Sequence, residues 1–103
     1  MGAVTSVRVL GIDLAVEKDG LVGRERLNLA EYHPGTGRIV LDDMLSAQQQ
    51  GESLVHELVE AINNKLDLEL SHPTICGLAQ GVYAFMRENG EAVRRIVAGR
   101  AIV

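Results

Sequence analysis

The chain has 103 residues, of which 47% are hydrophobic and 23% are charged, and its formal net charge is −4. These values predict one globular domain, residues 1–103, with enough core to fold without disulfides or a structural metal. The acidic balance argues against nucleic acid as a partner, because a phosphate-binding surface needs an excess of basic residues.

The sequence also indicates the cellular compartment of the protein. No apolar run approaches the length of about eighteen residues that spans a membrane, and no apolar signal core follows a basic start at the N-terminus. A single cysteine, Cys76, rules out an internal disulfide and fits a reducing compartment. We therefore expect a cytoplasmic protein without a membrane partner.

The first half of the chain shows strand patterns. Residues 7–16 are rich in β-branched side chains and are followed by an Asp-Gly turn signal. Residues 26–32 alternate polar and apolar side chains with a period of two, and residues 38–42 return as a strand after the turn-forming stretch 33–37. We expect about three antiparallel strands here, the last two forming a hairpin.

A long helix should follow the strands. Ser46 and Gln49 form a capping-box pattern, and the helix that it opens is expected to run to about Leu66. Its apolar side chains recur at the spacing of one helix face, which predicts a core stripe made of Leu54, Leu58, Ala61, Ile62 and Leu66.

A second helix should begin after a short connection. Pro73 suits its first turn, with Ser71 or His72 as the cap, and Asn89-Gly90 should end it. Residues 91–98 can form one more short helix. The predicted fold class is therefore α+β: an antiparallel sheet, two packed helices and a short C-terminal helix. The expected core face of the second helix is Ile75, Leu78, Ala79, Val82, Phe85 and Met86.

The first of these helices carries the sequence His-Glu-Leu-Val-Glu, from His56 to Glu60, on its polar side. Residues four apart share a helix face, and a glutamate beside the first ligand can reach a metal-bound water. This is the layout of a zinc hydrolase helix, except that Glu60 stands where a second histidine is usual. With His72 as third ligand, the expected zinc site is His56, Glu60 and His72, and Glu57 is left as general base.

Other interpretations of these residues stay open. A His-Glu-x-x-Glu run is often only a solvated helix face, and His72 before a proline can be only a helix cap. Cys76 lies one turn beyond His72 and could complete a four-ligand structural site, although a lone cysteine among apolar neighbours is more often a small core residue. Asp67 and Glu69 are alternative carboxylates in the connection.

Four further residues bear on the surroundings of the predicted site. Asp42 and Asp43 could orient His56 through its other ring nitrogen. His33 is expected to be an exposed turn residue. Tyr83 lies three helical turns past His72, about 16 Å of rise, which is too far to serve the same metal, so packing or contact with a partner is the better interpretation.

The residues from Leu54 to Asn89 also carry a resemblance. Three runs, Leu-Val-His-Glu-Leu-Val-Glu-Ala-Ile-Asn, Leu-Asp-Leu-Glu-Leu-Ser-His and Gly-Val-Tyr-Ala-Phe-Met-Arg-Glu-Asn, resemble small bacteriophage and prophage proteins with His-Glu-x-x-(His/Glu). Those proteins are usually regarded as zincin-like metallopeptidases, and residues 32–43 look like their hairpin before the active helix. The resemblance covers roughly residues 26–89, about 60% of the chain.

The resemblance implies a minimal zincin fold in a bacterial host, with zinc at His56, Glu60 and His72. Two functions follow. In the first, the protein is a zinc-dependent metallopeptidase whose strand 38–42 lines the cleft and receives a peptide or protein substrate by strand addition. In the second, it is a non-catalytic phage accessory or interaction protein of the same fold, able to form an oligomer, with a structural or empty metal site.

Overall fold

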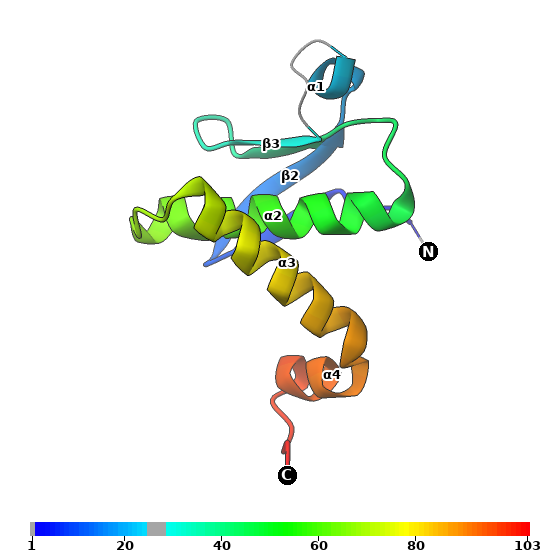
Figure 1. Cartoon of the computed structure of the whole chain (residues 1–103), viewed down its shortest axis with the longest axis vertical. Coiled ribbons are helices and arrows are strands. Elements are labelled where there is room, and N and C mark those ends of the chain that lie inside the picture. Colours follow the sequence, from blue (N-terminus) through cyan, green and yellow to red (C-terminus); the bar gives the residue numbers. More distant parts are fainter. Residues whose placement is uncertain (1, 25–28) are drawn as a thin grey trace.

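A computed structural model describes residues 2–24 and 29–103 of the chain (Figure 1). Residues 25–28, which belong to the predicted strand 26–32, lie outside the described residues. In chain order the elements are β1 (Ser6–Val9), β2 (Ile12–Lys18), α1 (Gly20–Arg24), β3 (Ala30–His33), β4 (Arg38–Leu41), α2 (Ala47–Leu66), α3 (His72–Glu88) and α4 (Gly90–Ala98).

The predicted α+β class is confirmed, but the sheet has four described strands and is mixed. Its order is β1-β2-β4-β3, with β1/β2 and β3/β4 antiparallel and β2/β4 parallel. The predicted strand 7–16 is two strands, because Leu10 and Gly11 take positive φ values of 50° and 82° and form a two-residue hairpin turn. The parallel pair arises because β3 takes the outer edge and β4 returns beside β2.

The helix α2 crosses one face of this sheet and closes the core. The predicted capping box is present: Gln49 N–H donates to Ser46 Oγ, and Ser46 N–H donates to Gln49 Oε1. Tyr32 of β3 donates to Asn64 Oδ1 of α2 at 3.3 Å, which ties the edge strand to the helix. Leu66 is 53% exposed and does not join the predicted core stripe. The central buried cluster is Val9, Leu14, Ile39, Leu41, Leu45 and Ala61.

The helix α3 packs against α2 from its first turns as far as Tyr83, which contacts Gln48 of α2. Ile75 and Ala79 are buried at their crossing, as predicted. The remaining predicted core residues of α3 are 37–48% exposed. These are Leu78, Val82, Phe85 and Met86. Toward its C-terminal end α3 runs away from the sheet (Figure 1), which leaves the later apolar side chains without a second surface to cover them. The short helix α4 packs on the far end of α3 and has no buried residue. No helix in the described part of the chain has the length and apolarity needed to cross a membrane.

Candidate metal centre

A cavity of about 840 Å³ opens between β3, the polar face of α2 and the part of α3 from His72 to Ala84. Glu31 and Tyr32 line it from the sheet. The residues that line it from the helices include all four predicted site residues: His56, Glu57, Glu60 and His72. Segments far apart in the sequence thus converge on one hollow.

His56 and Glu60 form the α2 side of the centre. They are one helical turn apart, and Nε2 of His56 lies 3.6 Å from Oε1 of Glu60. Their side chains are 25% and 31% exposed, so both remain accessible from the cavity. Two ligands at zinc bond lengths of about 2.1 Å and tetrahedral angles lie roughly 3.4 Å apart, so this pair already has the spacing of two ligands on one ion.

His72 and Cys76 form the α3 side. Ser71 is the N-cap of α3, where its Oγ accepts from the backbone N–H of Thr74, and His72 is the first residue of the helix. The capping role considered for His72 is therefore taken by Ser71, which leaves the imidazole for other contacts. Nε2 of His72 lies 3.4 Å from Sγ of Cys76, one turn further along.

The two sides meet across the cavity. The rings of His56 and His72 have centroids 5.8 Å apart. One donor atom from each of His56, His72 and Cys76 can be chosen so that all three lie within 4.8 Å of one another. Imidazole and thiolate groups at this spacing can hold a metal ion after small side-chain rotations.

Glu57 is a buried carboxylic acid that lines the same cavity, and the residue is only 6% exposed. Burial raises the pKa of its carboxyl group from the ordinary value of 4.5 to about 7, and the negative charges of Glu60 and Glu31 add to this effect. A carboxyl group with such a pKa exchanges a proton readily near neutral pH. A cation bound beside it would favour the ionised form.

The other carboxylates considered from the sequence do not line this cavity. Asp67 and Glu69, both at positive φ, lie in the connection between α2 and α3. Asp42 and Asp43 follow β4 and are also absent from the lining. Glu60 is therefore the carboxylate that the fold brings nearest to His56.

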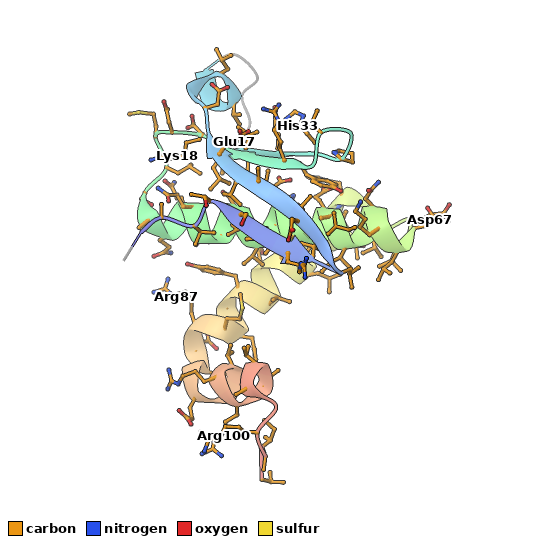
Figure 2. The ribbon with its side chains drawn as sticks, turned by 180° about the vertical axis from the view of Figure 1, so that it is seen from behind. Glu17, Lys18, His33, Asp67, Arg87 and Arg100 are labelled. Atoms are coloured by element: carbon orange, nitrogen blue, oxygen red, sulfur yellow. The ribbon has the colours of Figure 1, made fainter. Side chains whose placement is uncertain are left out.

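His33 is also outside the centre. Its Nε2 lies 3.1 Å from Oε1 of Glu31, and it borders a separate cavity of about 210 Å³ together with Glu17 and Lys18. In Figure 2 these three labelled residues lie above α2 in the view. The expectation that His33 is an exposed turn residue is wrong, because it is the last residue of β3 and is partly buried.

The prediction that the strand 38–42 lines the cleft and receives a peptide is wrong. Residues 38–41 form β4, which lies between β2 and β3 and uses both of its edges in the sheet. Within the described residues, β3 pairs with β4 alone and is the strand that lines the cavity. The error arose because the sequence showed a hairpin without showing which of its strands would be covered by β2.

Two residues of the cavity wall were not identified as such from the sequence. Glu31 acts on the proton affinity of Glu57, and Tyr83 lines the same cavity and donates to the backbone oxygen of Gln48 at 3.5 Å. Gly51 is a glycine inside a helix, which is a sequence signal that another group packs closely there. In the structure that group is Tyr83, because a Cβ at Gly51 would lie 3.2 Å from its ring. The tyrosine thus crosses α2 where a side chain is missing.

Comparison with known proteins adds no relative: no family model, no curated protein and no solved structure matches this chain.

Proposed function

We propose that this protein is a small zinc-dependent peptide hydrolase, with His56, Glu60 and His72 as metal ligands and Glu57 as general base. The observation that carries the proposal is the position of Glu57: a buried carboxyl group, with a pKa of about 7, adjacent in sequence to one ligand and lining the same cavity as the other two. The resemblance to zincin-like phage proteins supports the same assignment.

The donor set suits zinc in particular. Two histidines and one glutamate are an established ligand set of hydrolytic zinc, which keeps its fourth position for water. When bound, zinc would act as a Lewis acid and lower the pKa of that water. The chain's own residues would do the rest: His56, Glu60 and His72 would hold the ion, and Glu57 would take a proton from the attacking water and pass it to the leaving amine.

The proposed substrate is an extended peptide lying along β3. Among the described residues β3 is an end strand of the sheet, and Ala30 and Tyr32 place it at the cavity, so its outer edge is where a peptide segment would pair. The cavity of about 840 Å³, which Tyr32 and Tyr83 both line, has room for a substrate side chain. The peptide backbone would then pass beside the proposed ligands.

A second candidate is a non-catalytic accessory protein of the same fold. It is favoured by the apolar side chains on the outer half of α3 and on α4, such as Phe85 at 45% and Val97 at 82% exposure, which suit contact with another protein. In that case the metal centre is structural or empty, and hydrolysis is absent.

Two measurements on protein purified without a metal-affinity tag separate these candidates. Metal analysis is expected to find one equivalent of zinc, and a peptide library is expected to be cleaved. Glu57→Gln should abolish cleavage, by at least a hundredfold, while zinc content and thermal stability hold. Glu52→Gln is the matched control, because Glu52 lies on the same helix and the same cavity but is not beside a ligand.

The outcomes that contradict hydrolysis are distinct. Cleavage that survives Glu57→Gln would indicate a contaminating protease. Stoichiometric zinc with no cleavage at high protein concentration would favour the accessory protein with a structural ion. A folded protein with no affinity for zinc would remove the metal site from both candidates.

A further inference from the structure

We propose that the Cys76 thiolate is a fourth ligand of this metal centre and closes it in the resting protein. The inference rests on the proposed ligands His56, Glu60 and His72 and concerns the regulation of that same site. It gives Cys76 a role that neither catalysis by Glu57 nor packing of the core requires.

The distance from Cys76 to His72 is the first argument. For bond lengths of about 2.3 Å to sulfur and 2.1 Å to nitrogen, two ligands on one tetrahedral zinc ion lie roughly 3.6 Å apart. Sγ of Cys76 and Nε2 of His72 are 3.4 Å apart. The two residues are held on one face of α3 by their spacing of one turn, so the backbone itself sets this distance.

The symmetry of the two helices is the second argument. Each supplies a pair of donors one turn apart: His56 and Glu60 at 3.6 Å on α2, and His72 and Cys76 at 3.4 Å on α3. The α3 pair and His56 offer three donor atoms within 4.8 Å of one another, and Glu60 adjoins them through its contact with His56. The three donors of that group need to move by about 1 Å to reach the tetrahedral spacings near 3.4–3.6 Å. Glu60 is not part of the group, and its carboxylate must rotate toward His72 and Cys76 to complete a four-ligand set.

The surroundings of Cys76 are the third argument. The core positions of this part of α3 are occupied by Ile75 and Ala79, which are 3% and 4% exposed. Cys76 is only partly buried, lines the cavity and has no disulfide partner. Packing in the core, which the sequence favoured for this residue, therefore does not account for its position.

Charge balance also favours a thiolate ligand. A Zn²⁺ ion with two neutral imidazoles and the Glu60 carboxylate carries a net charge of +1. The Cys76 thiolate brings the centre to neutrality, which lowers the cost of holding it in a half-buried cavity. With Cys76 bound, four protein ligands fill the coordination sphere and no position remains for the water on which Glu57 would act. Hydrolysis then requires Cys76 to leave the ion.

Cobalt substitution tests the thiolate ligand directly. Because Cys76 is the single cysteine of the chain, any thiolate-to-cobalt charge-transfer absorption in the near ultraviolet can come from this residue alone. We expect the wild-type protein titrated with Co²⁺ to show this band. Cys76→Ser should lose it and bind Co²⁺ at least tenfold more weakly, whereas Glu60→Gln, the control on the opposite helix, should keep it.

A second measurement needs no variant and is independent of folding defects. X-ray absorption of the zinc-loaded wild-type protein should show one sulfur neighbour at about 2.3 Å among nitrogen and oxygen neighbours. Opening of the site is tested by Cys76→Ala, which should retain zinc in the presence of excess metal and cleave peptides at least tenfold faster than the wild type.

The failures of this inference and of the proposed function can be told apart. Metal binding without a charge-transfer band or a sulfur neighbour overturns the role of Cys76 and leaves the hydrolase proposal standing. A sulfur neighbour with no gain of cleavage in Cys76→Ala overturns the closing of an active site and supports a structural ion. Absence of Co²⁺ and Zn²⁺ binding in the wild type overturns both proposals.

Discussion

The two halves of α3 carry one continuous apolar stripe in very different surroundings. Near its start, Ile75 and Ala79 lie against α2 and are almost fully buried. Two turns later, Val82 and Phe85 on the same stripe are each 45% exposed. Periodicity therefore states which face of a helix can be buried, but only the presence of a second surface makes it core.

The same contrast extends to the whole molecule. The sheet, α2 and α3 up to about Tyr83 form a packed body, whereas the end of α3 with α4 forms an arm that projects from it (Figure 1). Figure 2 shows Arg100 on this arm, well away from the sheet. The candidate metal centre lies in the body, so the arm is not needed to bring its residues together.

The largest difference in stability is expected between two alanine substitutions, one at each end of the apolar stripe of α3. Ile75→Ala removes a buried side chain at the crossing with α2 and should lower the free energy of unfolding by roughly 2–5 kcal/mol. Phe85→Ala, although it removes a larger side chain, should cost only about 1 kcal/mol because nearly half of the residue is already in water. Urea unfolding of both variants measures this; equal losses would show that the arm is packed in solution.

The second-largest effect should be a pH dependence of stability that arises from Glu57 in the packed body and not from the arm. In the metal-free protein the pKa of Glu57 is about 7, above its value in the unfolded chain, so the folded state holds this proton more tightly. Stability is therefore unaffected by Glu57 below about pH 4.5 and falls as the pH rises toward 7, by up to roughly 3 kcal/mol.

The measurement is urea unfolding of metal-free wild-type protein and of Glu57→Gln at several pH values. The stability difference between the two should shift in favour of the variant as the pH rises from about 4.5 to about 7. Glu91→Gln, on the exposed helix α4, is the control and should show no such trend. A difference independent of pH would mean that folding does not raise the pKa of Glu57.

The smallest effect concerns two helical glycines. Gly81 lies on the outer part of α3, with nothing within 4 Å of a Cβ placed on it, so Gly81→Ala should raise the free energy of unfolding by about 0.5–1 kcal/mol through helix propensity. Gly51 is at the crossing, where the Cβ would meet the Tyr83 ring at 3.2 Å, so Gly51→Ala should gain less or lose stability. Thermal unfolding compares them; an equal gain at both would mean that Tyr83 does not rest on α2.

Local features of the fold could be predicted well from the sequence. Ser46 with Gln49 marked the start of α2, and Asn89 marked the end of α3, because capping depends on side chains within a few residues of the helix terminus. The positions of His56, Glu57 and Glu60 on one side of α2 followed from helix geometry in the same way. Sequence spacing alone determined these relations, since each involves residues less than two turns apart.

Relations between distant segments were decided by the tertiary structure. The pairing of β2 with β4, the place of β3 at the end of the described sheet and the partial burial of Cys76 depend on how elements meet, which no local pattern records. An antiparallel helix pair was expected to bring His72 to His56. The distance between the two rings, and the presence of Cys76 in the same cluster, follow from the way α2 and α3 cross. By itself the sequence determined which residues can bind a metal and on which helix they lie; the packing of those helices decided which donors share one cavity, because burial and contact are properties of the surfaces that meet.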